Sequence, residues 1–222
     1  MNNLFQRIIT SVILLFIISI SLFYNKYTWL FFLIIVSFIL FIEFDNLIKK
    51  IWKNQKNIII KLKLFSLLFL VMLIYVSYDI YNNPPTRLLF IILICIFSDT
   101  GGYLIGNLIG GKKLTKISPN KTISGSIGSF TFSLFPIPIF WLYFYLTKDL
   151  SLSNDTYVKF IPLCLFLCLI CQIGDLFISY FKRKANVNDT GSILPGHGGL
   201  LDRIDGVIFV LPTAYVINKF FY

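Results

Sequence analysis

The chain has 222 residues, of which 57% are hydrophobic and only 14% are charged, too few polar side chains to cover a water-facing surface. Its formal net charge of +10 would suit nucleic acid, but the Lys and Arg residues lie between long apolar runs, not along one face of a soluble module. Composition and charge therefore argue against a water-soluble fold and a nucleic-acid partner. They predict an all-α, polytopic transmembrane helix bundle.

Seven apolar runs are close to the ~20 residues that a helix needs to cross the bilayer core. The first could be mistaken for a signal peptide, but no small-residue cleavage site follows it, which favours a retained helix. The third is preceded by Lys61 and Lys63, so an interfacial piece followed by a span is an alternative there. Pro136 and Pro138 lie inside the fifth run and are expected to kink it. The runs cover residues 8–24, 28–45, 64–81, 87–109, 123–146, 157–181 and 204–221.

Charge bias gives the orientation of these spans. If the N-terminus lies in the cytoplasm and the spans alternate, fifteen of the twenty Lys and Arg residues fall in cytoplasmic segments. The positive-inside rule predicts this asymmetry. We therefore expect about seven spans, with the N-terminus in the cytoplasm and the C-terminus outside.

Two carboxylates lie inside apolar runs, Asp99 in the fourth and Asp175 in the sixth, both in the inner half. A carboxylate in hydrocarbon costs roughly 2.5–3.5 kcal/mol on insertion scales, so each needs a partner, a cavity or a bound cation. Their similar depth favours a shared cation, although a helix cap or a lysine would also satisfy either one. Asp175 precedes Lys182 and Arg183 by two turns. A transporter or channel is an alternative, but the outer halves of the spans hold few polar groups to line a path.

The last cytoplasmic loop holds the densest set of polar residues. Residues 195–199 read Pro-Gly-His-Gly-Gly, which favours a tight turn whose backbone amides can cradle phosphate oxygens. Asp202 and Asp205 are three residues apart, so on a helix they share one face and can bind a divalent cation together. Carboxylate ligands indicate Mg²⁺ rather than Zn²⁺. His197, the single histidine, is a phosphate ligand, a proton carrier or a brace for the turn.

Two patterns of small residues are better explained by packing. Cys168 and Cys171 form a lone C-x-x-C inside the sixth run, where cysteine packs as a small apolar side chain. Gly102, Gly106 and Gly110 recur every four residues, which lets helices approach closely. Neither pattern by itself indicates catalysis.

At the last loop the chain resembles the phosphatidate cytidylyltransferase family. The family signature runs Ser, two residues, Lys-Arg, then Lys-Asp-x-Gly, Pro-x-His-Gly-Gly and Asp-Arg-x-Asp. A second similar stretch runs from Ser98 to Gly125. Asn188 stands where the family usually has Lys, and Ser124 where it often has Glu. The signature is matched at Ser179, Lys182, Arg183, Asp189, Gly191, Pro195, His197, Gly198, Gly199, Asp202, Arg203 and Asp205.

The resemblance implies an enzyme of phospholipid biosynthesis that transfers CMP from CTP to phosphatidate, giving CDP-diacylglycerol and pyrophosphate. It implies a single integral-membrane domain over residues 1–222, with N-terminal spans in 1–97 and the catalytic half in 98–222. It further implies a multi-pass protein of the bacterial inner membrane, a homodimer, and Mg²⁺ as cofactor, alone or with a second cation. Other lipid phosphates as acceptors, and an inactive scaffold, are the alternatives within this family.

The residue pattern and the resemblance together give the expected roles. Catalysis is expected of Asp175, Asp189, Asp202, Asp205, Lys182 and Arg183. Metal binding is expected of Asp175, Asp202, Asp205 and Asp99. Substrate binding is expected of Lys121, Ser118, His197, Gly198, Gly199 and Arg203.

Overall fold

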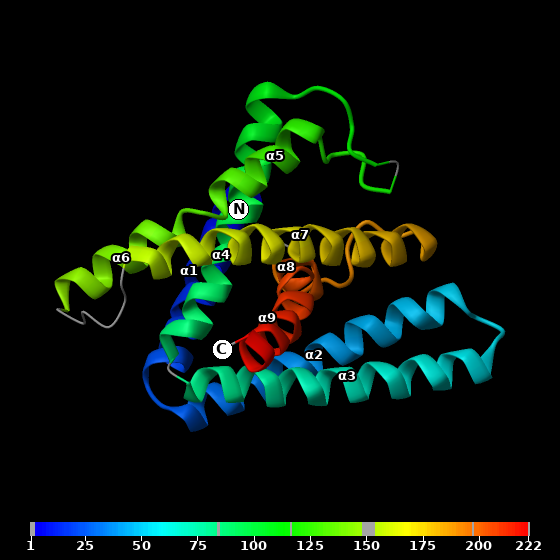
Figure 1. Cartoon of the computed structure of the whole chain (residues 1–222). Coiled ribbons are helices and arrows are strands. Elements are labelled where there is room, and N and C mark those ends of the chain that lie inside the picture. Colours follow the sequence, from blue (N-terminus) through cyan, green and yellow to red (C-terminus); the bar gives the residue numbers. More distant parts are fainter. Residues whose placement is uncertain (1–2, 84, 116, 148–153, 197, 222) are drawn as a thin grey trace. The chain divides into compact units, whose positions relative to one another are not determined.

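A computed structural model describes residues 3–83, 85–115, 117–147, 154–196 and 198–221, most of them helical (Figure 1). No strand occurs in these ranges, where extended backbone pairs only in two isolated β-bridges. The expected all-α fold is therefore confirmed. The helices are α1 (Asn3–Phe23), α2 (Lys26–Ile51), α3 (Lys56–Asn82), α4 (Pro85–Ile109), α5 (Ile123–Phe132), α6 (Pro136–Leu146), α7 (Asn154–Lys184), α8 (Leu201–Ile204) and α9 (Val207–Phe221).

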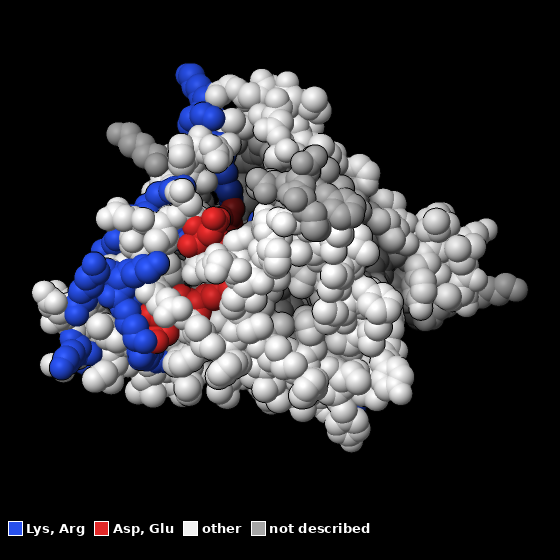
Figure 2. All heavy atoms as spheres, turned by 180° about the vertical axis from the view of Figure 1, so that it is seen from behind, with Lys and Arg blue, Asp and Glu red and all other residues white. Residues whose placement is uncertain are grey.

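Five helical stretches of the described chain are long and apolar enough to cross a membrane: α2, α3, α4, the α5–α6 pair and α7 from Lys159. Their outward side chains are apolar; on α2, Phe31 and Phe38 are each 66% exposed. In Figure 2, charged side chains gather at one side of the view, and most of the other described surface in that view is uncharged. Large apolar groups are this exposed where lipid is the solvent, because there they lose nothing by facing outward. The protein is a polytopic membrane helix bundle.

Several helix bounds differ from the expected spans; α2, for example, continues to Ile51. Helix α3 begins at Lys56, so Lys63 lies inside it, where its long stem lets the ammonium reach Asp45 at 2.7 Å. The fifth span is interrupted between Phe132 and Pro136, which confirms the expected kink. Helix α9 has 15 residues, about 22 Å at 1.5 Å per residue, and α1 contributes a shorter apolar stretch, Val12–Phe23. The count of seven spans and the side of the N-terminus stay predictions.

The chain forms two compact units. Unit 1 comprises Met1–Pro85 and Ile178–Asp205, and unit 2 comprises Thr86–Phe177 and Gly206–Tyr222. Both units draw on early and late parts of the sequence. The expected single domain, with N-terminal spans in 1–97 and a catalytic half in 98–222, stays a prediction. Helix α7 contributes to both units.

Unit 1 is built on helices α2 and α3, which lie side by side (Figure 1). Leu33, Leu40 and Leu47 recur every seven residues along α2 and are at most 5% exposed, so they form its buried stripe. Where α2 begins and α3 ends, the rings of Trp29 and Tyr81 stack with centroids 6.1 Å apart. This hairpin presents the end of α2 that holds Glu43 to the last loop.

In unit 2, helices α4 and α5 meet through glycines. A Cβ added at Gly128 would lie 2.7 Å from a backbone oxygen of α4, and one added at Gly125 would lie 2.8 Å from the oxygen of Gly102. Such separations admit only glycine, which confirms the close approach expected at Gly102 and Gly106. Gly110 instead follows the end of α4 with φ of 63° and open space around it, because a left-handed residue terminates the helix there.

The four cysteines are buried thiols that form no disulfide. The Oγ of Ser98 on α4 lies 3.3 Å from the Sγ of Cys168 on α7. A Cβ added at Gly206, just before α9, would lie 3.1 Å from the backbone oxygen of Cys171. These thiols fill space between the helices of unit 2, as small apolar side chains do.

Candidate functional site

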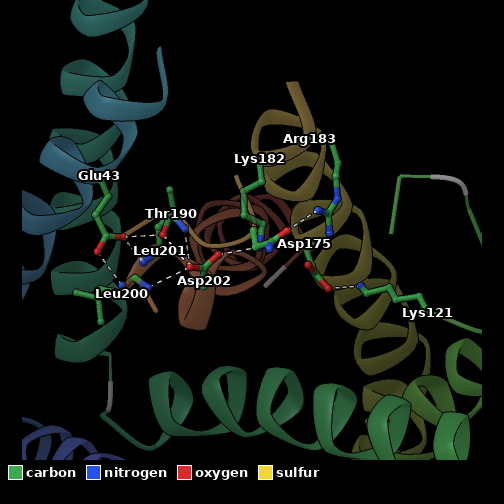
Figure 3. A network of polar contacts seen from close by, with 11 residues as sticks. Glu43, Lys121, Asp175, Lys182, Arg183, Thr190, Leu200, Leu201 and Asp202 are labelled. Atoms are coloured by element: carbon green, nitrogen blue, oxygen red, sulfur yellow. Dashed lines mark hydrogen bonds and ion pairs between the residues drawn. The ribbon is translucent and has the colours of Figure 1, made fainter. Parts of the chain in front are cut away.

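In unit 1, Asp202 is the centre of a polar network at the last loop (Figure 3). Its Oδ1 accepts a hydrogen bond from the Lys182 ammonium at 2.7 Å, and the two side chains are only 7% and 13% exposed. Its Oδ2 accepts from the backbone N–H of Thr190 at 2.8 Å and of Gly199 at 3.1 Å. One carboxylate thus ties the end of α7, the turn at residue 190 and the start of α8 together.

Glu43 of α2 contacts the same loop. It was not among the site residues expected from the sequence. It is 2% exposed. Its Oε1 accepts from Leu200 N at 2.9 Å, and its Oε2 accepts from Leu201 N at 2.8 Å. The Thr190 hydroxyl, also missed, lies 2.9 Å from Glu43 Oε2 and 3.0 Å from Asp202 Oδ2. The sequence offered one signal for Glu43: it is an acidic residue inside the second apolar run. Like Asp99 and Asp175 in their apolar runs, such a residue needs a polar partner.

Aromatic rings hold the end of α7 against the end of α2. The Phe181 ring lies 5.5 Å from that of Phe44 and 6.3 Å from that of Trp52, measured between centroids. The Lys184 ammonium sits 4.7 Å from the centroid of the Trp52 ring, a cation–π contact. Two segments expected in the cytoplasm, residues 49–63 and 182–203, therefore meet at one end of unit 1.

An open hollow of about 510 Å³ lies at this end of unit 1. Cationic side chains on α2 face loop residues of the signature across it. Lys50 is exposed, and the Lys49 ammonium is paired with Asp45 at 2.7 Å while its side chain stays 54% exposed. The hollow thus combines positive charge with the polar turn after α7, a combination that suits a phosphate group. Its lining residues are Asn46, Lys49, Lys50, Asp189, Thr190, Gly191 and Ser192.

Unit 2 carries a second polar pair. The Lys121 ammonium contacts Asp175 Oδ2 on α7, and their side chains are 28% and 24% exposed (Figure 3). The lysine partner considered for Asp175 in the sequence is therefore present. One turn earlier on α7, Gln172 Oε1 accepts from the Ser126 hydroxyl of α5 at 2.5 Å. These contacts hold the loop between α4 and α5 against α7.

The loop that carries Lys121 is closed by its own backbone. Leu114 N donates to Lys121 O at 2.8 Å, and Ile123 N donates to Lys112 O at 3.0 Å. The Thr122 side chain then caps α5 by accepting from Gly125 N at 3.0 Å. Lys121 therefore stands at a fixed point just before a helix begins.

A family model described as the cytidylyltransferase family matches residues 47–221. The chain belongs to the cytidylyltransferase family. A phosphatidate cytidylyltransferase of Rickettsia typhi (strain ATCC VR-144 / Wilmington) is 33% identical over 221 residues, which are 98% of this chain and 92% of that protein. One of Rickettsia bellii (strain RML369-C) is 33% identical over 98% of this chain and 91% of its own length. One of Staphylococcus aureus (strain COL) is 44% identical over 141 residues, 63% of this chain and 52% of that protein.

The other residues that the sequence assigns to the site differ in how deeply they are buried. Asp189 and Arg203 are exposed, Asp205 is buried directly after α8, and Gly198 has φ of 82°. Gly199 is buried against Thr190 and Glu43. In unit 2, Ser118 is half-buried in the Lys121 loop, and Asp99 is exposed on α4 with its Oδ1 4.0 Å from Cys171 Sγ. His197 lies outside the described residues.

The two departures from the usual family pattern each have a local partner. Asn188 Oδ1 accepts from Arg183 Nη1 at 3.1 Å, a bond that a lysine, which has no acceptor, cannot make. The Ser124 hydroxyl donates to the backbone oxygen of Gly110 at the end of α4. A glutamate, ionised, has no hydrogen to donate there. Both substitutions therefore stabilise the loops they belong to.

The carboxylates fit Mg²⁺ in a particular way. Across the described ranges, no group of three or more His, Cys, Asp or Glu side chains gathers. Mg²⁺ is usually held by one or two carboxylates together with substrate phosphates, not by an all-protein cage. Asp202 in unit 1 and Asp175 in unit 2 each offer carboxylate oxygens and are neutralised here by a lysine. This donor set suits a cation that arrives with phosphates.

Proposed function

We propose that this cytidylyltransferase is a phosphatidate cytidylyltransferase, which uses CTP and phosphatidate to form CDP-diacylglycerol and pyrophosphate. The observation that carries the proposal is that relatives with this name match 98% of the chain, both polar clusters included. A polytopic bundle with polar side chains at the ends of apolar helices also suits a reaction between a lipid phosphate and a soluble nucleotide.

The reaction is a nucleotidyl transfer. An oxygen of the phosphatidate phosphate attacks the α-phosphorus of CTP, and the bond from that phosphorus to the bridging oxygen of the β-phosphate breaks. Pyrophosphate leaves with that electron pair. The protein needs to supply little covalent chemistry, so alignment of the two phosphates and neutralisation of their charge account for most of the rate.

Basic side chains of each unit would bind the phosphates. In unit 1 these are Lys182, Arg183 and Arg203, and Lys182 is held in place by the Asp202 carboxylate. In unit 2, Lys121 is fixed by Asp175 and by its closed loop. The hollow beside Lys50 would take the phosphate tail of CTP, because it is open and lined with cationic and polar groups. The Pro-Gly-His-Gly-Gly turn supplies backbone amides.

Mg²⁺ is proposed as the cofactor, alone or with a second cation. The candidate ligands are Asp202 and Asp205 in unit 1 and Asp175 and Asp99 in unit 2. When bound, Mg²⁺ would withdraw charge from the phosphate oxygens.

We also propose the membrane in which the protein lies, its orientation and its oligomeric state. The relatives are bacterial, and we propose that the chain lies in the bacterial inner membrane with the last loop on the cytoplasmic side, where CTP is made available. A homodimer is proposed by family resemblance alone. Cysteine labelling from outside intact cells at position 192, in the exposed part of the last loop, would contradict this orientation.

The decisive experiment is an assay of the purified, reconstituted protein with labelled CTP and phosphatidate vesicles. CDP-diacylglycerol should form only when Mg²⁺ and both substrates are present. Lipid phosphates with other apolar chains, tested in parallel by thin-layer analysis, separate a different acceptor from the proposed one. Ion flux in liposomes without CTP would favour a transporter, and no product with any lipid phosphate would overturn the proposal.

A further inference from the structure

Glu43 is more deeply buried than any other acidic side chain that the structure describes. A buried carboxylate is costly unless it is fully hydrogen-bonded. Each bond that Glu43 accepts within the described chain comes from an uncharged donor: the N–H groups of Leu200 and Leu201 and the Thr190 hydroxyl. These donors all belong to the last loop. The carboxylate is therefore built into that loop, although it is more than 140 residues earlier in the sequence.

The bonds of Glu43 meet a specific need of α8. This helix has only four residues, and Leu200 at its N-cap has no side chain that can accept from the first N–H groups. Glu43 takes the place of the missing cap, with one oxygen on Leu200 N and the other on Leu201 N. A negative charge at that end also suits the helix dipole. The orientation of α8 is thus set from α2.

Asp202 directly follows Leu201 in α8. Because Glu43 fixes the backbone at Leu200 and Leu201, it also fixes the direction in which the Asp202 side chain points. Thr190 links the two carboxylates, since its Oγ1 lies 2.9 Å from Glu43 Oε2 and 3.0 Å from Asp202 Oδ2. A hydroxyl has one hydrogen, so it donates to one carboxylate at a time. Thr190 also donates its backbone N–H to Asp202, which keeps that carboxylate in place when the hydroxyl turns toward Glu43.

Two glycines of the loop leave room for this carboxylate. A Cβ added at Gly191 would lie 2.8 Å from Glu43 Oε1, and one added at Gly199 would lie 2.6 Å from Glu43 Oε2. The backbone can therefore wrap the carboxylate only because these positions have no side chain. Their presence in the loop is explained by Glu43 as well as by phosphate.

We propose that Glu43 is a positioning residue for the transfer: by capping α8 and holding Thr190, it sets the direction of Asp202 and, through it, of Lys182. This inference rests on the proposed function for its activity readout. Glu43 is 2% exposed, so it acts through Asp202 and not directly on a substrate. Because misplacement of a catalytic group by about 1 Å costs up to a hundredfold in rate, loss of the cap should lower turnover more than it lowers the amount of folded protein.

The test compares Glu43→Gln with Asp45→Asn in the full-length reconstituted protein. Asp45 is the matched control, because it is the neighbouring acidic residue of α2 but binds Lys49 and Lys63 instead of the loop. In Glu43→Gln, the –NH₂ of the side-chain amide replaces one carboxylate oxygen. It then faces the backbone N–H of Leu200 or Leu201, which is also a donor, so a hydrogen bond is lost. We expect kcat per folded protein to fall on the order of ten- to a hundredfold in Glu43→Gln, with KM for both substrates changed less than threefold. Asp45→Asn should keep the wild-type kcat.

Two further measurements keep the inference open to refutation. Hydrogen exchange at residues 199–202 should speed up in Glu43→Gln but not in Asp45→Asn, whatever the activity. Thr190→Val, which loses the hydroxyl, should lower kcat more than Thr190→Ser, which keeps it. If the wild-type protein is inactive, the proposed function is wrong, and the hydrogen-exchange result alone tests whether Glu43 caps α8. An active wild type with unchanged kcat and unchanged exchange in Glu43→Gln overturns the positioning role.

Discussion

The ion pair between Lys182 and Asp202 gives a quantitative prediction. Its 2.7 Å distance is the same as that between Lys49 and Asp45, but the side chains of the first pair are 13% and 7% exposed and those of the second 54% and 13%. Water screens the second pair far more than the first. Because the distance is the same in both pairs, comparing them isolates the effect of burial on the strength of an ion pair.

Asp202→Asn should destabilise unit 1 substantially. The amide would direct a donor either at the Lys182 ammonium or at the N–H groups of Thr190 and Gly199, so at least one buried donor is left unpaired in either orientation. Removing one partner of a buried, charged network costs about 3–5 kcal/mol, and partial exposure of Lys182 reduces this to about 2–4 kcal/mol. Synthesis of CDP-diacylglycerol should be lost in the fraction that still folds.

A double-mutant cycle measures the coupling directly. Reversible unfolding in mixed micelles, followed for Asp202→Asn, Lys182→Met and the double variant, should give a coupling free energy of about 2 kcal/mol. The same cycle with Asp45→Asn and Lys49→Met should give a much smaller coupling, because water screens the exposed Lys49. Equal coupling in the two cycles would show that burial of Asp202 does not strengthen its ion pair, and the reasoning would be refuted.

Three further predictions concern other parts of the chain. Lys121→Met should lower CDP-diacylglycerol synthesis at least tenfold with little loss of thermal stability, because its partner Asp175 is only partly buried; Lys121→Arg, assayed beside it, should be less impaired. Lys50→Gln at the hollow should raise KM for CTP several-fold and leave KM for phosphatidate unchanged, whereas equal changes in both would place CTP elsewhere. Gly128→Leu should abolish folded protein in detergent, since even its Cβ would meet α4 backbone at 2.7 Å, while Gly110→Ala, at an open position with positive φ, should cost only about 1 kcal/mol.

The sequence alone determined the class of the fold and the chemical character of the site. Apolar runs of bilayer length could only become helices, because lipid offers no partner for an open backbone. The carboxylates inside those runs marked polar positions, because such residues are too costly in hydrocarbon to be incidental. The spaced signature at Lys182, Asp202 and their neighbours marked the last loop. Proline at position 136 located the kink.

Tertiary structure decided which polar groups meet. Glu43 binds residues 190, 200 and 201, and such a contact over so long a separation leaves no periodic trace in the sequence. The lysine partners of Asp175 and Asp202 likewise depend on how loops close, as do the local partners of Asn188 and Ser124. Helix periodicity fixes only neighbours three or four residues apart. Distant hydrogen bonds are chosen by packing, and at this site it is packing that decides where each charge points.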